Sequence, residues 1–435
     1  MTGNLVETSE PRDATGSHAE SCGAVVDSDV SRCASSMLRV LVFDSSSKLL
    51  LAAATVILIR VMSPIEYARY TISYAYAMVL TQLIAGSFNR VYLVGYKSLG
   101  LERQLGEFLS LQLLTIIVAA PLLLLLSPTR SIGIAAAALL LSLCLGEFAR
   151  STFQRALRFT AFSLLEFGRA VLTVLGIATI AWFLGEGLRA SQVLLVQSGV
   201  SVLLFGMSMR LRLLVRLPHW QVVHAIGSDL ARSQYRSLFA YFLVQAIFSQ
   251  VDILVLKMTG TDHQLASYGS AYRYYTFLLL CLTAVNSVLL PLVQSFTTWA
   301  EIDEAMRRQR TALGIYGLIV LFLIAVAPAL LPLVDRGKYP TAPGVFRILA
   351  FSSVVSLAFS PYVNVVMRLG QFRTLLSLVV VACPLGVGLN LCLLPMLGEK
   401  GTAISVLVST AILNCGAYRF VQARRAASPV RLPNE

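Results

Sequence analysis

The sequence predicts an all-α membrane protein with about twelve transmembrane helices. Three observations lead to this fold class: 57% of the 435 residues are hydrophobic, only 13% are charged, and the apolar residues gather in runs of about twenty. An ordinary soluble domain has about 25% charged residues, and about 20 consecutive apolar residues are enough to cross a bilayer as a helix. The chain is therefore predicted to pass through a membrane repeatedly.

The first element is a polar stretch, residues 1–38, which lacks the apolar side chains needed for packing and is predicted to be a disordered cytoplasmic tail. About twelve hydrophobic segments follow, at residues 40–62, 70–94, 107–126, 132–149, 161–184, 190–209, 237–258, 268–293, 312–333, 343–366, 374–395 and 401–421. We assign the first six to an N-terminal half (39–209) and the last six to a C-terminal half (237–421). A basic cytoplasmic linker (210–236) joins the halves, and a short cytoplasmic tail (422–435) ends the chain.

The two halves begin their second segments in a similar way. Tyr67-Ala68-Arg69-Tyr70 resembles Tyr268-Gly269-Ser270-Ala271, and each follows a short loop after a segment that ends in methionine, Met62 or Met258. Six spans in each half would make the repeats parallel, related by a pseudo-twofold axis along the membrane normal. Such an arrangement places a central cavity between the halves.

Basic residues are distributed unevenly over the connecting loops. If the N-terminus is cytoplasmic, the inside loops and tails hold roughly 23 Lys and Arg residues and the outside loops roughly 8. The positive-inside rule then predicts that both termini are cytoplasmic. In a soluble protein the net charge of +13 would suggest binding to nucleic acid. Here the excess of Lys and Arg in the inside loops accounts for the net charge, so no nucleic acid is expected as a partner.

Catalytic and metal-binding patterns are absent from the sequence. It has no GxSxG, P-loop or HExxH motif, and its seven cysteines form no CxxC or Cys/His cluster. Five of the cysteines lie in apolar runs, where they are expected to serve as small hydrophobic residues. We therefore expect a protein that is not an enzyme and that has no catalytic residue, metal site or cofactor.

One hydrophobic segment, Ser237–Met258, carries its polar groups on one side. They follow one another at steps of four, four and three residues: Tyr241, Gln245, Ser249 and Asp252. A helix would stack them on one face. A carboxylate at membrane depth costs roughly 2.5–3.5 kcal/mol on insertion scales, so it normally faces a bundle interior or a wet cavity. We expect this face to line such a cavity.

Further ionisable or amide groups lie in or at the ends of other segments of both halves. The candidates for lining a common central cavity are Asp44, Lys48, Arg90, Glu166, Arg169, Gln245, Asp252, Arg273 and Asn286.

Each charged candidate has an alternative explanation. Asp44 could form a local ion pair with Lys48 on its own helix, and Glu166 could do the same with Arg169. Arg90 lies near the end of a segment and could extend to the membrane surface. Asp252 could simply pair with a cation on another helix, for which Arg273 on the next segment is the obvious choice.

Several short motifs resemble those of one transporter family. They are Met62-Ser63-Pro64-Ile65-Glu66-Tyr67 after the first segment, Arg336-Gly337-Lys338-Tyr339 after the ninth, and Asn390-Leu391-Cys392-Leu393-Leu394-Pro395-Met396-Leu397-Gly398 followed by Gly401-Thr402-Ala403-Ile404. Over residues 40–421 the chain resembles the polysaccharide transporter family of the multidrug/oligosaccharidyl-lipid/polysaccharide (MOP) exporter superfamily.

This resemblance implies a flippase in the bacterial cytoplasmic (inner) membrane. Its cargo would be a polyprenyl-pyrophosphate-linked oligosaccharide, moved to the outer leaflet by alternating access for the synthesis of exopolysaccharide, capsule or O-antigen. Membrane lipids are expected partners, and a polysaccharide polymerase and export machinery are further candidates. Arg273, Arg169 and Lys48 would supply cations for the diphosphate.

Two other functions remain open. A multidrug or cation antiporter of the same superfamily would need an acid-dominated cavity. A membrane glycosyltransferase or oligosaccharide polymerase would favour a large outer loop, whereas the outer loops expected here are short.

Overall fold

The computed structural model describes Phe43 and residues 46–89, 105–155, 158–209, 235–296 and 298–427. Within these ranges the chain is helical and forms no sheet, which confirms the predicted all-α class. The predicted tail 1–38 lies outside the described residues. So do most of the linker 210–236 and the end of the C-terminal tail 422–435, whose described parts belong to helices.

The described helices follow the predicted hydrophobic segments in order. They are residues 46–61, α2 (Pro64–Thr81) with the π-helical turn η1 (Gln82–Gly86), α4 (Leu105–Leu126), α5 (Arg130–Arg155), α6 (Phe159–Leu184) with the turn η3 (Gly185–Gly187), α7 (Ala190–Met209), α9 (Tyr235–Phe248), α10 (Val251–Thr259), α11 (Asp262–Ser295), α12 (Trp299–Asp335), α13 (Ala342–Arg368), α14 (Phe372–Leu397) and α15 (Glu399–Ala427). Among the described residues, eight helices are long and apolar enough to cross a membrane, or nine if α9 and α10 form one bent span. The count of about twelve spans remains a prediction.

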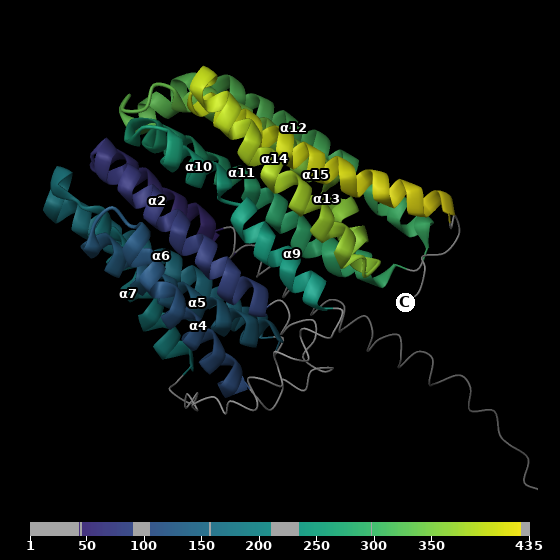
Figure 1. Ribbon diagram of the computed structural model, residues 1–435, viewed down its shortest axis with the longest axis horizontal. Coiled ribbons are helices and arrows are strands. Elements are labelled where there is room, and N and C mark those ends of the chain that lie inside the picture. The colour runs from purple at the N-terminus through teal and green to yellow at the C-terminus, as the bar shows by residue number, and fades with distance from the viewer. Residues whose placement is uncertain are drawn as a thin grey trace, which may run out of the picture.

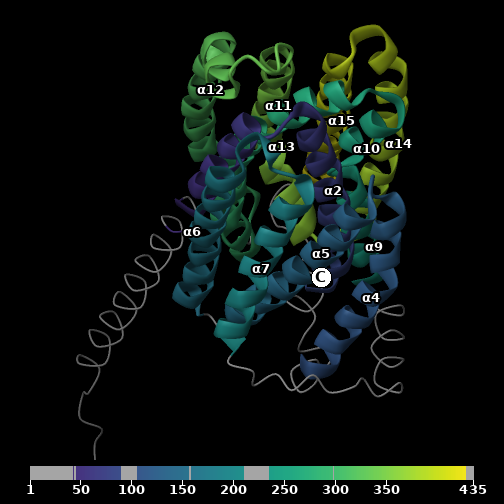
Figure 2. The same ribbon diagram turned by 90° about the vertical axis from the view of Figure 1, so that its left-hand side faces the viewer.

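The helices form two bundles that lie side by side (Figures 1 and 2). The first half contains α2 to α7 and the second half α9 to α15. The same pairs of neighbours pack in both: α5 with α7 and α13 with α15, α4 with α5 and α12 with α13, α6 with α7 and α14 with α15, and α2 with α5 and α11 with α13. This repeated packing supports the predicted relation between the halves.

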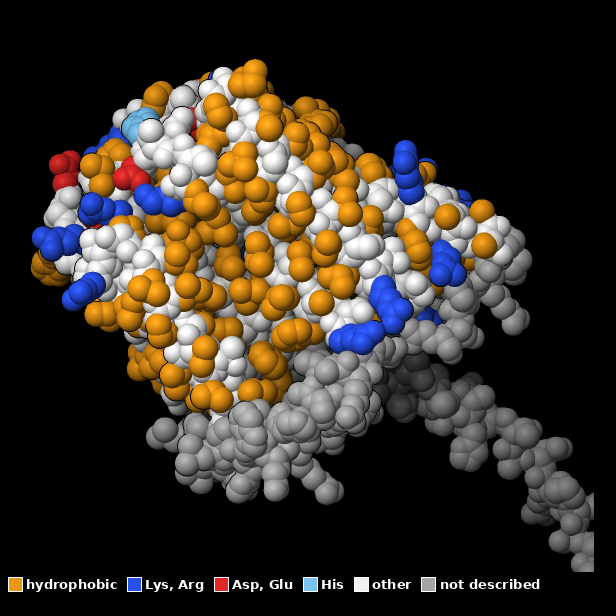
Figure 3. Space-filling view, viewed as in Figure 1, with side chains coloured by type: hydrophobic (Ala, Val, Ile, Leu, Met, Phe, Trp, Pro, Cys, Tyr) orange, Lys and Arg blue, Asp and Glu red, His pale blue; other side chains and the backbone are white. Residues whose placement is uncertain are grey.

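The outer surface is apolar over the middle of the molecule. Large hydrophobic side chains are exposed on α4, α6 and α12, among them Val118, Trp182 and Leu318 at 73%, 86% and 69% exposure. Figure 3 shows hydrophobic side chains over the middle of one face, with Lys and Arg side chains toward its two ends. Exposing so wide an apolar surface to water is unfavourable, so this surface is the part of the protein that contacts lipid.

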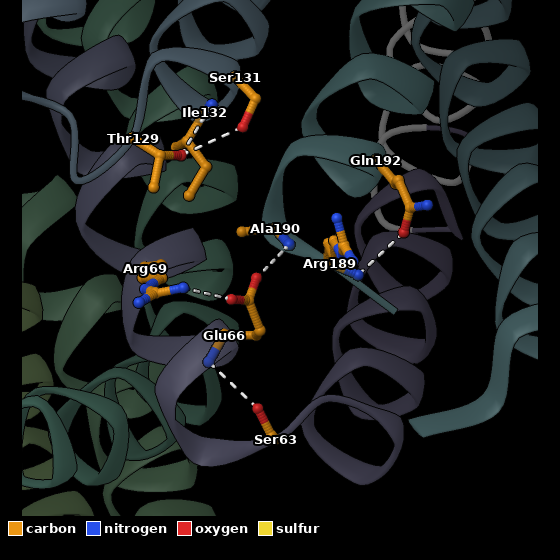
Figure 4. Close-up of polar contacts among 9 residues, drawn as sticks. All are labelled: Ser63, Glu66, Arg69, Thr129, Ser131, Ile132, Arg189, Ala190 and Gln192. Atoms are coloured by element: carbon orange, nitrogen blue, oxygen red, sulfur yellow. Dashed lines mark hydrogen bonds and ion pairs between the residues drawn. The ribbon is translucent and has the colours of Figure 1, made fainter. Parts of the chain in front are cut away.

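The beginning of α2 shows how the helix ends are fixed. The Ser63 hydroxyl accepts a hydrogen bond from the backbone N–H of Glu66 (3.3 Å), and Pro64 occupies the first helical position. The Glu66 carboxylate in turn accepts hydrogen bonds from Arg69 (2.7 Å) and from the backbone N–H of Ala190 (2.9 Å), as Figure 4 shows. This carboxylate therefore joins the start of α2 to the start of α7.

Loops that are predicted to lie on one side of the membrane do meet in space. Arg60 Nε donates to the carbonyl of Val334 (2.6 Å), and both belong to the predicted outer side. At the predicted cytoplasmic side, Arg425 forms two hydrogen bonds with the Asp303 carboxylate (2.9 and 2.6 Å). Segments that are predicted to lie on the same side of the membrane are thus at the same end of the molecule. Which end faces the cytoplasm remains a prediction.

The predicted span Ser237–Met258 is not one straight helix. It is broken at Ser249 and Gln250 into α9 and α10, which are bent by 43°. The hydroxyl of Tyr272, on α11, donates to the carbonyl of Ser249 (3.3 Å). A neighbouring helix thus satisfies a backbone group that the break releases, which is what makes a break tolerable at membrane depth.

The two halves approach each other most closely where α2 crosses α11. A Cβ atom on Gly269 would lie only 2.8 Å from Thr71 Cγ2 and 2.9 Å from its Oγ1. We expect Gly269→Ala to lower the unfolding free energy by about 1–3 kcal/mol through this overlap. Thr71→Ala should restore it, because Thr71 Cβ stays at 3.4 Å.

Thermal unfolding in detergent measures this effect. Gly199→Ala on α7 is the matched control, because nothing lies within 4 Å of its added Cβ. Both variants replace a helical glycine by alanine, so both gain the same helix propensity. Equal melting temperatures for Gly269→Ala and Gly199→Ala would contradict the prediction.

Candidate functional site

The predicted site residues do not share one central cavity. The structure divides them among three cavities: one between the halves, one inside the second half and one inside the first half. Asp44 and Arg90 lie outside the described residues, and for Asn286 only the helical backbone of α11 is described. One common cavity was predicted, whereas the described candidates line three cavities, two of which share Tyr272.

The cavity between the halves, here the inter-half cavity, has a volume of about 280 Å³. Residues 46–61, α2, α10 and α11 form its walls. Its lining includes two cations, Lys48 and Arg273, and the hydroxyls of Thr55, Thr71 and Thr276, but no carboxylate among the described residues. The predicted placement of Lys48 and Arg273 in one cavity is therefore seen in the structure.

Arg273 is held by tyrosine rings of the opposite half. Its guanidinium carbon lies 4.3 Å from the ring centroid of Tyr74 and 5.6 Å from that of Tyr70, both on α2. The hydroxyl of Tyr70 is itself fixed by Gln197, whose Nε2 donates to it (3.1 Å). Such stacking contributes about 2 kcal/mol when the cation is desolvated. It also orients the planar guanidinium, whose N–H groups suit an anion with two or more oxygens.

Both cations lie deep in the bundle. By the helical rise, Lys48 is about 20 Å from the end of its helix at residue 61, and Arg273 is about 17 Å from the start of α11. The hydrocarbon core is about 30 Å thick, so Arg273 lies near its middle and Lys48 about 5 Å from the middle toward the predicted cytoplasmic side. Charges at that depth are costly and are usually retained for function.

The halves touch on both sides of the inter-half cavity along α2. On the predicted outer side, Lys338 Nζ donates to the carbonyls of Arg60 (2.6 Å) and Met62 (3.1 Å), and the rings of Tyr67 and Tyr339 lie 5.8 Å apart. Burial lowers the pKa of the Lys338 amine.

On the predicted inner side, the ring of Phe88, just after η1, lies 5.5 Å from that of Phe239 on α9. Between these two sets of contacts α2 contributes Thr71, Tyr74 and Met78 to the cavity wall. The cavity is therefore flanked by contacts between the halves at both ends.

The second cavity lies wholly within the second half and is here called the second-half cavity. Its volume is about 440 Å³, and α9, α10, α11, α13, α14 and α15 surround it. The four polar residues predicted to share a face all line it: Tyr241, Gln245, Ser249 and Asp252. Their spacing along the chain thus places them on one cavity wall despite the bend between α9 and α10.

Asp252 does not pair with Arg273. Its carboxylate accepts a hydrogen bond from the hydroxyl of Tyr268, and Asn390 Nδ2 donates to its backbone carbonyl (3.5 Å). Tyr268 and Arg273 are five residues apart on α11, so their side chains leave the helix about 140° apart. Asp252 faces the Tyr268 side, and the expected Asp252–Arg273 pair is wrong for this reason.

Glu166 and Arg169 form the local ion pair that was the alternative explanation. Arg169 Nη2 lies 2.8 Å from Glu166 Oε2, three residues before it on α6. Both line a cavity of only about 30 Å³ among α5, α6 and α7, separate from the inter-half cavity. The space suits about one water molecule, so this pair is not placed to contact a large cargo.

The tyrosines of α2 were not among the predicted site residues. Tyr67, Tyr70 and Tyr74 recur at steps of three and four, and Tyr268, Tyr272 and Tyr275 do the same on α11. This spacing predicts a tyrosine face on each of two equivalent helices. It is the feature of the sequence from which these tyrosines could have been identified as site residues.

Comparison with known proteins gives no match to a family model or to a curated protein. Solved structures do match. A lipid II flippase MurJ in an inward closed conformation has a TM-score of 0.70 at 13% identity, with 88% of this chain and 87% of that chain covered. A MATE transporter of Vibrio cholerae, VcmN, has a TM-score of 0.60 at 17% identity, covering 92% and 98%. A MOP superfamily transporter from Pyrococcus furiosus has a TM-score of 0.56 at 13% identity, covering 90% and 96%.

Proposed function

We propose, from the premise that the chain has the fold of the MOP exporters, that it is a membrane flippase for a polyprenyl-pyrophosphate-linked oligosaccharide. The observation that carries this proposal is the inter-half cavity, whose described lining holds Arg273 near the middle of the membrane, Lys48 on the facing helix, and no carboxylate. A site with this charge favours an anionic cargo.

The chemistry of a lipid diphosphate fits this site. Its oxygens can accept paired hydrogen bonds from a guanidinium, and Arg273 is already oriented by Tyr74 for such a contact. The lipid tail can stay in the bilayer while the charged group crosses between the halves. Movement then requires the contacts on one side of the cavity to open while those on the other remain closed, which is alternating access.

The surroundings of such a protein follow from the same proposal. The bacterial cytoplasmic membrane is its location, with both termini on the cytoplasmic side, as the uneven distribution of Lys and Arg favours. Membrane lipids surround it. The cargo serves the synthesis of a cell-surface polysaccharide, with a polymerase and export machinery as candidate partners.

The two competing functions have less support. A cation antiporter would need an acid between the halves, whereas the described lining of the inter-half cavity has no carboxylate, and Asp252 lies in the second-half cavity, bound by Tyr268. A glycosyltransferase or polymerase would favour a large outer loop, whereas described connections at the predicted outer side, such as 127–129 and 260–261, are short.

A binding experiment distinguishes these functions. The purified full chain in nanodiscs is titrated with farnesyl diphosphate, farnesyl monophosphate, farnesol and the cation tetraphenylphosphonium. We expect the diphosphate to bind at least about tenfold more tightly than the monophosphate, since one more charge-assisted hydrogen bond contributes about 1.5–3 kcal/mol. Farnesol should bind weakly. Saturable binding of tetraphenylphosphonium without binding of the diphosphate would favour the antiporter instead.

A further inference from the structure

The second-half cavity is larger than the inter-half cavity and plays no part in holding the diphosphate. Its volume of about 440 Å³ lies within the range of about 300–1,000 Å³ that is usual for small-molecule sites, whereas the 280 Å³ of the inter-half cavity lies just below it. A diphosphate alone would leave this larger space unused. The second-half cavity therefore has room for a part of the cargo other than the diphosphate.

The lining of the second-half cavity is rich in hydrogen-bond acceptors. Gln245 Oε1 is buried without a partner among the described residues. The hydroxyls of Ser405 and Ser409 donate to carbonyls of their own helix (2.8 and 2.7 Å), and Asn414 Nδ2 donates to Thr410 (2.9 Å), so the oxygens of these side chains remain as acceptors. Sugar hydroxyls can donate hydrogen bonds to these oxygens.

Aromatic and uncharged side chains complete the wall. Tyr241, Tyr272 and Tyr275 contribute rings, and the described lining contains no Lys or Arg. Aromatic rings offer an apolar surface to the C–H faces of a sugar, while amide and hydroxyl groups reach its oxygens. The lining thus suits a neutral, hydroxyl-rich group and does not suit a second phosphate.

A thin wall separates the two cavities. Tyr272 lines both of them, and the neighbours Ser249 and Gln250 line one each. Gln250 Nε2 donates to the Tyr272 hydroxyl at 3.4 Å, and that hydroxyl donates to the Ser249 carbonyl at 3.3 Å. These bonds are longer than the usual 2.7–3.2 Å and lie at the break between α9 and α10, so the wall can move at little cost.

We infer that the second-half cavity binds the sugar residues nearest to the diphosphate, with Tyr272 at the boundary between the two parts of the cargo. This inference rests on the proposed function, because it places the sugars next to the diphosphate at Arg273. The residue that follows Tyr272 on α11 is Arg273, so a group bonded directly to the diphosphate needs to pass only this wall.

A bare metal cation explains the cavity less well. A water molecule takes about 30 Å³ of the liquid, so 440 Å³ has room for on the order of ten water molecules, far more than one ion needs. Asp252 is the only carboxylate in the described lining, and it already accepts the Tyr268 hydroxyl. The space and the many neutral acceptors fit a sugar better.

Two glycines of α14 provide a matched pair of variants. A Cβ on Gly386 would point at Ser409, 3.3 Å from its Cβ and Oγ, inside the second-half cavity. Gly388 has nothing within 4 Å and lies on the exposed side of the same helix. Gly386→Leu therefore fills the cavity, and Gly388→Leu makes the same change outside it. Gln245→Leu removes a hydrogen-bond acceptor from the same cavity. It tests the inference independently if Gly386→Leu does not fold.

The experiment compares two probes on the full chain in nanodiscs: farnesyl diphosphate, and farnesyl diphosphate carrying one galactose or one N-acetylglucosamine. The sugar is expected to tighten binding at least about tenfold, the effect of two ordinary hydrogen bonds. Gly386→Leu and Gln245→Leu should remove this gain and leave the binding of farnesyl diphosphate unchanged. Gly388→Leu should retain the gain, and Arg273→Ala should weaken both probes.

The outcomes separate this inference from the proposed function. If farnesyl diphosphate binds through Arg273 but the sugar adds nothing, or if the gain survives in folded Gly386→Leu and Gln245→Leu, the inference is overturned while the proposed function stands. If neither probe binds, both fail. Stabilisation by sodium chloride over choline chloride that Asp252→Asn abolishes, together with no gain from the sugar, would identify a cation site instead.

Discussion

Replacing Arg273 by alanine is expected to abolish flipping of a fluorescent polyprenyl diphosphate-linked sugar in proteoliposomes. The substitution removes a charge at mid-membrane depth and the paired donors that hold the diphosphate. Truncating one partner of a buried charge pair costs about 2–5 kcal/mol, which is a factor of about 30 to several thousand in affinity. The chain should still fold, because the lost stacking on Tyr74 contributes about 2 kcal/mol, less than the roughly 5–15 kcal/mol that stabilises a folded protein.

Three further variants make this prediction specific. Arg273→Lys should keep part of the activity, since the charge remains but the planar fork is lost. Arg347→Ala is the matched control: this arginine of α13 is exposed, lies outside the three cavities and donates to the carbonyl of Ile324 (3.1 Å). Its loss should leave flipping unchanged. The double variant Arg273→Ala/Asp252→Ala should stay inactive, because the two side chains are not paired, and normal flipping by it would contradict the assignment.

The fold class was predictable because the membrane restricts the choices so strongly. In hydrocarbon each backbone N–H and C=O must be satisfied within its own segment, so a run of apolar residues predicts a helix. The starts of α2 and α11 lie six residues before the predicted starts of their segments at 70 and 268, because Ser63 before Pro64 caps α2 and Thr261 caps α11 with Gln264. The break at Ser249 and Gln250 could not be predicted in this way, since it depends on the Tyr272 hydroxyl of another helix.

The site was predictable only where it depends on one helix. Gln245, Ser249 and Asp252 were predicted to share a face and do line one cavity, because spacings of three and four residues place side chains together along a helix. The partner of Asp252 depends instead on the rotation of α11 about its axis. A rotation of about 140° separates Tyr268 from Arg273, and a hydrophobic pattern does not determine it.

Which cavity a charged residue lines also depends on contacts that a single segment does not reveal. Glu166 and Arg169 are charged and lie within a span, which made them candidates for a central cavity. Three residues of separation on α6 let them neutralise each other, so they need no partner from the other half. Lys48 and Arg273 do line one cavity between the halves, and this depends on how residues 46–61 are placed relative to α11, which a single segment does not determine.

Cross-linking the halves on the predicted inner side is expected to stop flipping completely and reversibly. Alternating access requires the halves to separate on one side of the inter-half cavity at a time, and there the rings of Phe88 and Phe239 lie 5.5 Å apart. The π-helical turn η1 ends two residues before Phe88, and such turns often lie at functional sites. A tether between these positions would keep this side closed whatever the rest of the molecule does.

The measurement uses Phe88→Cys/Phe239→Cys in a chain whose native cysteines are replaced, treated with a short disulfide-forming bifunctional reagent. Flipping should fall to the level of protein-free liposomes and return on reduction. Asp303→Cys/Arg425→Cys is the matched control, because these side chains contact each other within the second half (2.6 Å), so a tether there leaves the halves free to move. Complete cross-linking of the Phe88 and Phe239 positions without loss of flipping would show that this side does not open during transport. The cargo would then have to enter from the bilayer between helices, and the contacts of Lys338 and Tyr67 would become the ones that must open.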